Sequence, residues 1–117
     1  MAIKVLKNNE DIYLVELSGA LDLYSSNQLK DLVMKMIKKK AEHFIISLNE
    51  VDSVNSAGIG ALIFISSTLK KLQNSLVIIV PEGPVMNALE VTRLKSYFSI
   101  ASSMKEAISL ISAAASA

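Results

Sequence analysis

The fold is decided by residues 44–80, which read FIISLNEVDSVNSAGIGALIFISSTLKKLQNSLVIIV. This stretch begins and ends with continuous apolar runs of strand length, 44–48 and 76–80, which are typical of strands buried on both faces of a parallel sheet. The residues between them, Ser56 to Leu72, predict a helix that is apolar almost all round at first and polar at its end. A crossover of this length permits parallel pairing, so the stretch predicts a right-handed strand–helix–strand unit.

An N-terminal hairpin is expected upstream of this unit. Ile3 to Leu6 and Ile12 to Leu17 are short runs of strand-forming residues, and the turn-forming residues 8–11 (NNED) separate them. Gly19 to Tyr24 is expected to form a loop or turn, after which the sequence changes to a helical period.

An amphipathic helix is predicted after this loop. Its apolar residues recur at the i, i+3, i+4, i+7, i+8 spacing and are Leu29, Leu32, Val33, Met36 and Ile37. Ser25 fits the N-cap of this helix, and Gln28 three residues later completes the pattern of a capping box. Lys38 to Lys40 is expected to close the helix, since cations suit the negative end of the helix dipole.

Downstream of residue 80, Pro81 to Pro84 breaks the chain. A third helix is expected over about residues 84–94, and a weak strand is expected near Tyr97 to Ala101. The segment 103–106 has the pattern of a capping box and opens a fourth helix. The small residues from Ser112 to Ala117 are expected to fray.

The resulting order is strand–strand–helix–strand–helix–strand–helix–strand–helix. It predicts an α/β fold with one mostly parallel sheet and an N-terminal hairpin. The 117 residues fit a single domain, 1–117, without an internal repeat or linker. Hydrophobic residues make up 51% of the chain and charged residues 20%, which supports a folded core and argues against a disordered chain.

The composition also excludes several kinds of site. The formal net charge of +1 gives no long-range field toward phosphate backbones or anionic lipid, so neither a nucleic acid nor a membrane is expected as a partner. The absence of cysteine excludes disulfides, thiolate zinc sites and cysteine nucleophiles, and the single His43 excludes a multi-histidine metal site within one chain. No metal or cofactor is therefore expected.

Targeting signals are not visible in the sequence. Residues 1–10 lack the apolar segment of a signal peptide. The longest uncharged apolar run, Ala57 to Ile65, has nine residues and is too short to span a bilayer. A cytoplasmic protein without membrane insertion is expected.

Functional residues are expected at the carboxyl ends of the strands, where the sites of open α/β sheets gather. The segments that follow the strands there are 19–26, 49–56 and 81–83. This topology brings four candidate side chains toward one edge: Asp22, Tyr24, Ser25 and Ser56.

The most informative segment is 52–60, DSVNSAGIG. Ser56 falls at the N-cap or in the first turn of the central helix, where free backbone N–H groups and the dipole favour negative charge. Gly58 and Gly60 cost about 1 kcal/mol each relative to alanine, which indicates close approach by another backbone, either a neighbouring helix or a protein partner. Spacing alone favours a simpler interpretation, in which Asn55 or Ser56 caps the helix and the glycines ease internal packing.

Two of these segments resemble a known family when they are taken together. Gly19-Ala20-Leu21-Asp22, followed by Tyr24-Ser25, resembles the G-x-[IL]-D segment of STAS domain proteins, and residues 54–60 resemble their D-S-x-G-[LI]-G segment. From about Ile3 to Ile111 the chain is similar in order and length to the bacterial anti-sigma factor antagonists. The resemblance implies a single STAS domain.

The resemblance also implies a switch controlled by phosphorylation. In that family an anti-sigma factor with serine kinase activity phosphorylates the serine that corresponds to Ser56. The unmodified antagonist binds this kinase and releases the sigma factor, and a PP2C-type phosphatase restores the unmodified form. The partner-binding residues implied in this chain are Asp22, Tyr24, Ser25, Asn55, Ser56, Ala57, Gly58 and Gly60. Many members carry aspartate directly before the serine, whereas Asn55 can cap the helix but removes a charge from the docking surface.

Two other functions compete with this one. Catalysis is not expected, because no G-x-S-x-G elbow surrounds Ser56. The single histidine, His43, precedes the predicted strand and should lie at the opposite end of the sheet from Ser56, so Ser56 would have no nearby base. The segment from Gly58 to Gly60 also lacks the third glycine of a dinucleotide loop and the lysine of a P-loop. A STAS module that binds a protein or small ligand without phosphorylation, in a signalling or transport assembly, stays open.

Overall fold

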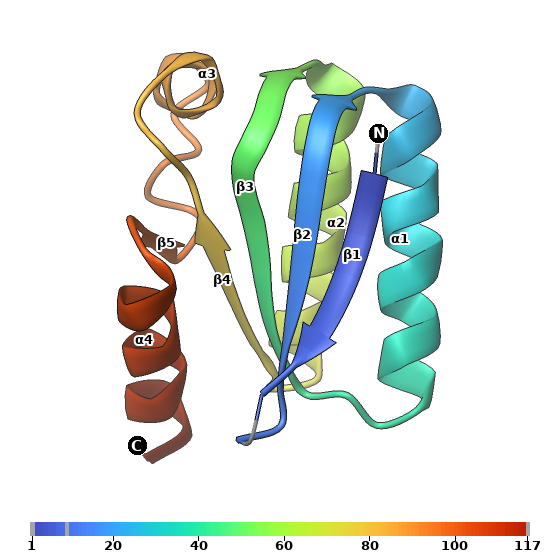
Figure 1. Ribbon diagram of the computed structural model, residues 1–117, viewed down its shortest axis with the longest axis vertical. Helices are drawn as coiled ribbons and strands as arrows, with labels where there is room; N and C mark the ends of the chain where they lie inside the picture. The colour runs from blue at the N-terminus through green and yellow to red at the C-terminus, as the bar shows by residue number, and fades with distance from the viewer. Residues whose placement is uncertain (1, 9, 117) are drawn as a thin grey trace.

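The structure, a computed structural model, describes residues 2–8 and 10–116. Its strands are β1 (Ala2–Lys7), β2 (Ile12–Leu21), β3 (His43–Val54), β4 (Ser75–Ile79) and β5 (Ile100–Ala101). Its helices are α1 (Leu23–Lys38), α2 (Ser56–Lys71), α3 (Pro84–Val91) and α4 (Met104–Ser116). Figure 1 shows these elements, which follow one another in the predicted order. Within the described residues, no helix combines the length and the apolar character needed to cross a bilayer.

The strands form one sheet in the order β1-β2-β3-β4-β5. β1 is antiparallel to β2, and every later pair is parallel, so the predicted hairpin and the mostly parallel sheet are confirmed. At the tip of the hairpin, the Asn8 side-chain oxygen accepts the Ile12 N–H (2.9 Å). Asn9, which belongs to the predicted turn, lies outside the described residues.

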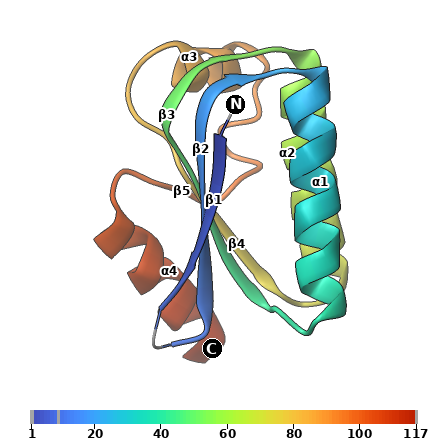
Figure 2. The same cartoon turned by 45° about the vertical axis from the view of Figure 1, so that its right-hand side comes forward.

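Helices cover both faces of the sheet. Figure 2 shows α1 and α2 on one face and α4 on the other. Along β3, Phe44 and Ile46 belong to the larger core cluster with the buried residues of α1 and α2, whereas Ile45 belongs to a second cluster with Ile111 of α4. The apolar run of this strand is continuous because each of its faces has a helix to pack against.

Both central strands extend further toward their carboxyl ends than the sequence predicts. Residues 19–21, expected to form a loop, are the end of β2, and residues 49–54 are the end of β3. The pairing of these strands shifts register twice, and Gly19, beside the second shift, has a φ of 91° that suits glycine. Such bulges interrupt the alternation of side chains, so the sequence pattern does not reveal these strand ends.

Three helices end with the same backbone motif. The residue in the left-handed conformation is not glycine in any of them: Lys40 (φ 72°) follows α1, Gln73 (φ 60°) follows α2 and Arg93 (φ 60°) follows α3. The next N–H bonds to the carbonyl oxygen five residues earlier, as from Asn74 to Leu69 (2.8 Å), which makes each end a Schellman motif. The motif ends α3 at Val91, short of the expected residue 94.

The start of α4 is capped in part as expected. Ser103 Oγ accepts the Glu106 N–H (3.1 Å), while the Glu106 carboxylate accepts the Ser102 hydroxyl instead of a backbone N–H (3.1 Å). α4 continues to Ser116. Of the tail that is expected to fray, Ala117 lies outside the described residues, and fraying stays a prediction.

Candidate functional site

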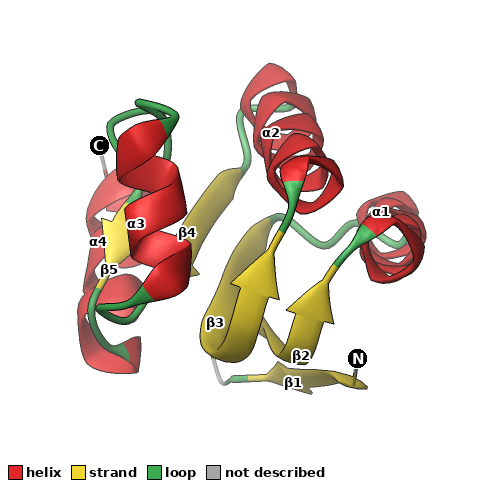
Figure 3. Cartoon of the chain, turned by 90° about the horizontal axis from the view of Figure 1, so that it is seen from above, coloured by secondary structure: helices red, strands yellow, loops and turns green. Residues whose placement is uncertain are grey.

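Two helices begin side by side at the carboxyl edge of the sheet. The register pairs Leu21 of β2 with Val54 of β3, and the next residue on each strand, Asp22 or Asn55, is the N-cap of a helix. Figure 3 looks down on this edge and shows α1 and α2 starting just beyond the ends of β2 and β3. We call residues 22–26 and 55–60 the rim. The structure thus brings together two of the three predicted segments.

The third predicted segment is separate from the rim. Pro81 to Gly83 leads from β4 into α3, and Figure 3 shows α3 on the opposite side of the molecule from α1. The expectation that all three segments meet at this edge is therefore met only for residues 19–26 and 49–56.

Asp22, and not Ser25, is the N-cap of α1, which corrects the predicted cap. The Asp22 carboxylate accepts the Ser25 N–H (3.0 Å), and Ser25 Oγ accepts the Asp22 N–H (2.9 Å), which together form a capping box. The Ser25 N–H and then the Ser25 hydroxyl lower the pKa of the exposed Asp22 carboxyl below its usual value. The rim therefore carries one negative charge at neutral pH.

Ser25 lies beneath the rim rather than on its surface. Its side chain is 2% exposed, and its hydroxyl lies 3.0 Å from both the Ala20 carbonyl oxygen and the Asp22 carboxylate. Ser25 can reach a partner only through the carboxylate that it orients. Of the other predicted partner-binding residues, Gly58 is buried, Ala57 is half-buried, and the exposed ones are Asp22, Tyr24, Asn55, Ser56 and Gly60.

The central helix opens with a neutral cap and a free serine. Asn55 Oδ1 accepts the Gly58 N–H (3.0 Å), and the Asn55 N–H donates to the Leu21 carbonyl oxygen (3.3 Å). Ser56 is the first residue of α2, it is exposed, and its hydroxyl bonds to no described residue. The first turn contains no acidic side chain, so the positive end of the dipole has no counter-charge there. An anion added at Ser56 would be stabilised.

The two glycines of α2 have different roles. A Cβ on Gly58 would lie 2.6 Å from the Leu21 carbonyl oxygen and 2.7 Å from Val54 Cγ2, so only glycine lets α2 start this close to the end of β2. The close approach inferred from the sequence therefore exists at Gly58, but it is made by a strand end and not by a neighbouring helix. A Cβ on Gly60 would meet nothing within 4 Å. Internal packing explains Gly58 and leaves Gly60 available to a partner.

Three large apolar or aromatic side chains are exposed at or near the rim: Tyr24, which the sequence predicts as a partner-binding residue, and Leu23 and Phe64, which it does not. Leu23 and Tyr24, in the first turn of α1, are 64% and 73% exposed, so both side chains are accessible to a partner. Phe64 is 48% exposed, and the Lys30 ammonium lies 5.6 Å from its ring centre. Ser56, Gly60 and Phe64 follow at four-residue spacing and share one face of α2. Only this spacing from Ser56 could have signalled that Phe64 is exposed.

His43 is too far from the rim to act as an acid or base for Ser56. His43 is the first residue of β3, and that strand runs for 12 residues before Asn55. The imidazole therefore lies at the opposite end of β3 from Ser56, as the sequence predicts. Within the described residues no cluster of three or more His, Cys, Asp or Glu side chains could hold a metal ion.

A family comparison agrees with this arrangement. The model of the STAS domain matches residues 4–107. The chain belongs to the STAS domain family. The match includes both segments of the rim, so the helix starts described above lie within the STAS domain itself.

Solved structures share the fold of this STAS domain at low sequence identity. One is a proposed anti-sigma factor antagonist, TM1081 from Thermotoga maritima (TM-score 0.86, 17% identity, 93% of each chain covered). Another is the Bacillus cell fate determinant SpoIIAA in its phosphorylated form (TM-score 0.73, 17% identity, 94% of this chain and 99% of that one). A third is a sulfate transporter family protein from Wolinella succinogenes (TM-score 0.77, 14% identity, 96% of this chain and 93% of that one).

Proposed function

We propose that this STAS domain is an anti-sigma factor antagonist that is switched by phosphorylation of Ser56. In its unmodified form it binds an anti-sigma factor with serine kinase activity in the cytoplasm, and the sigma factor is released. The phosphorylated form does not bind until a PP2C-type phosphatase removes the phosphate. The domain acts by binding and has no catalytic activity of its own. The observation that carries the proposal is the exposed Ser56 hydroxyl at the start of α2, which bonds to no residue in the described part of the chain.

A phosphate at this position would change binding more than folding. It adds about −1.5 to −2 charges at pH 7. The dipole of α2 offsets part of this charge, by about 0.3–2 kcal/mol, so the domain stays folded. A partner packed over Ser56 would have to bury the dianion or place an acidic group beside it, which costs several kcal/mol.

Asn55 favours this use of Ser56. The only charged side chain among the described rim residues is Asp22, on the neighbouring helix. An aspartate at position 55 would add a second negative charge directly before the modified serine, whereas the Asn55 amide caps α2 without one. The departure from the family pattern therefore leaves the helix start more receptive to phosphate.

The descriptions of two solved structures with the same fold support the proposal. TM1081 is described as a proposed anti-sigma factor antagonist, and SpoIIAA has been solved in a phosphorylated form. The chain resembles both over nearly its whole length.

The test is phosphorylation and binding with candidate anti-sigma kinases. The purified protein is incubated with kinase and ATP, and the phosphate is mapped by mass spectrometry. Kd is then measured for wild type, Ser56→Ala and Ser56→Asp. We expect phosphate on Ser56, wild-type affinity for Ser56→Ala, and a loss of about 100-fold for Ser56→Asp, which corresponds to about 2.8 kcal/mol.

The control is Ser109→Asp, which adds the same charge at an exposed position of α4 and is expected to keep wild-type affinity. A Ser56→Asp variant that binds the kinase as tightly as wild type rejects the switch.

A second candidate function is a STAS module that binds its partner without phosphorylation, in a signalling or transport assembly. The similarity to the sulfate transporter family protein favours it. In that case a kinase that clearly binds the protein leaves Ser56 unmodified in the same experiment.

A further inference from the structure

Part of the edge of β4 is left unpaired. β5 pairs with only the last two residues of β4. The Ile78 N–H donates to the Ser99 carbonyl oxygen (2.9 Å) on this edge, whereas the Ser75 N–H donates to Glu42 (3.0 Å) on the opposite side. Because alternate residues of a parallel strand face the same neighbour, Leu76 presents its N–H and C=O to the edge that carries β5. Neither group has a main-chain partner among the described residues.

The chain that precedes β5 is held away from this edge. Phe98 is 6% exposed and packs into the larger core cluster. The Lys70 ammonium of α2 donates to the Tyr97 carbonyl oxygen (3.3 Å) and lies 4.0 Å from the centre of the Tyr97 ring. These contacts fix the residues that would have to move if β5 lengthened, so β5 cannot cover Leu76 while they persist.

A half-open cleft of about 240 Å³ lies over the uncovered edge. Its apolar lining comes from Leu69 of α2, Leu76 and Val77 of β4, and Leu110 and Ile111 of α4. Leu110 is 40% exposed, so this side of the cleft is open to solvent. Among the described residues of the lining, Lys70 is the one charged side chain and none is acidic. The cleft combines apolar walls, unpaired main-chain groups and a positive charge.

We propose that this cleft binds a short extended segment of a partner protein, which adds as a strand to β4. The main chain of the segment pairs with the N–H and C=O of Leu76, as in other complexes formed by strand addition. An apolar side chain of the segment enters between Leu69 and Leu110, and an acidic side chain faces Lys70. The backbone groups of Leu76, which lack a main-chain partner among the described residues, select an extended peptide, and the positive charge of Lys70 favours an acidic one.

This surface is distinct from the rim. α2 begins at Ser56 and lines the cleft from Ser66 to Lys70, so the two sites are about 15–20 Å apart along the helix. The inference therefore goes beyond the proposed switch and does not depend on Ser56.

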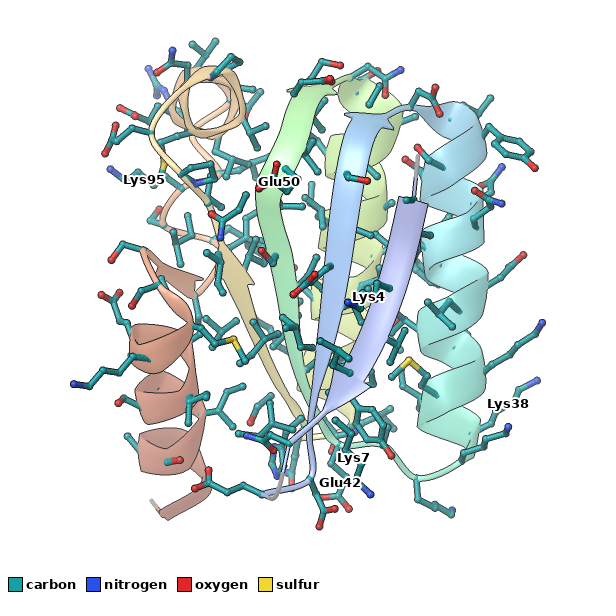
Figure 4. All side chains as sticks on the ribbon, viewed as in Figure 1. Lys4, Lys7, Lys38, Glu42, Glu50 and Lys95 are labelled. Atoms are coloured by element: carbon teal, nitrogen blue, oxygen red, sulfur yellow. The ribbon has the colours of Figure 1, made fainter. Side chains whose placement is uncertain are left out.

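The opposite edge of the sheet, formed by β1, is less suited to the addition of a strand. β1 pairs only with β2, but it carries Lys4 and Lys7, which Figure 4 labels along this strand. Charged side chains on an edge strand discourage the addition of another strand.

The test uses a defined pool of peptides and the full chain. The pool contains acetylated, amidated pentapeptides with Val, Ile, Leu or Phe at the second and fourth positions and Thr, Ser or Asp elsewhere. The isotope-labelled protein is titrated to a total peptide concentration of about 10 mM, which detects binding when the average Kd over the pool is near 1 mM. We expect the Leu76 amide signal to shift and its hydrogen exchange to slow by at least about tenfold in the presence of the pool.

Matched variants and peptides locate the interaction. Leu110→Glu is expected to abolish binding, whereas Val91→Glu, which changes an 83% exposed residue of α3 in the same way, is expected to leave it intact. The tightest peptide is then synthesised with single N-methylated amides, and loss of binding at one position identifies the N–H that pairs with Leu76. This second arm needs no variant and holds even if Leu110→Glu fails to fold.

Three results would overturn the proposal: no spectral change with the pool, binding without protection of Leu76, or equal binding of every N-methylated peptide. Ser56→Asp is expected to bind the pool like wild type, so failure here and failure of the phosphorylation switch are told apart.

Discussion

At the rim, the Asp22 carboxylate accepts the Ser25 N–H and lies next to the Ser25 hydroxyl, and both contacts favour its charged form. Its pKa is therefore lower in the folded than in the unfolded chain. The resulting stabilisation is complete above the usual value of 3.8 and is lost as the pH falls through the folded pKa. Asp22→Asn keeps a good cap but cannot titrate, so its stability is expected to fall less than that of wild type between about pH 5 and pH 2.

Urea unfolding across this pH range measures the difference. Asp31→Asn, which removes an exposed carboxylate from the middle of the same helix, is the control and is expected to follow the wild-type slope. Parallel pH profiles for wild type and Asp22→Asn would contradict the assignment.

Gly58 and Gly60 allow a matched comparison within one helix. Gly58→Ala places a Cβ 2.6 Å from a backbone oxygen that cannot easily move, and we expect it to destabilise the domain by about 1–3 kcal/mol. Gly60→Ala meets no atom and is expected to stabilise it by about 0.5–1 kcal/mol. Free energies of unfolding from urea titrations check both values. Equal effects of the two substitutions would refute the packing role of Gly58.

Among the secondary-structure elements, three helices end with residues that do not give the highest stability. Gln73 holds a φ of 60° in the Schellman motif after α2, a position that glycine occupies without strain. We expect Gln73→Gly to raise the free energy of unfolding by about 0.5–1 kcal/mol. Gln28→Gly, the same change at an exposed position inside α1, is expected to lower it by about 1 kcal/mol. Thermal unfolding of both variants against wild type measures the effects, and a lower Tm for Gln73→Gly would be the contrary result.

The elements also show how far the sequence could be interpreted. The start of α2 at Ser56 was predictable, because an asparagine cap, small residues and a change of period coincide there. The cap of α1 was not, since Asp22 and Ser25 are both good caps and only the extension of β2 to Leu21 decides between them. Apolar residues such as Phe64 are usually buried, and only the packing of α2 in the whole fold leaves this ring exposed.

For the whole molecule, the proposed switch requires a domain that stays folded when Ser56 becomes negative. We expect the free energy of unfolding of Ser56→Asp to equal that of wild type or to be about 0.3–1 kcal/mol higher, because the added charge faces the positive end of the α2 dipole. Ser66→Asp, on the same helix but at a position that is 4% exposed, is expected to destabilise by more than about 2 kcal/mol. Chemical denaturation measures the stability of both variants. If Ser56→Asp were unfolded, its loss of binding would be explained by unfolding and would not support the switch.

The hairpin determines how the protein is best attached to a solid support. Ala2 pairs with Ser18, so the chain enters the sheet a few residues from the end of β2, while α4 runs toward the other end of the molecule (Figure 1). A tag or carrier fused ahead of Ala2 would crowd the surface around Ser56. Immobilisation through a tag placed after α4 leaves that surface facing the solution, where an incoming kinase can reach it.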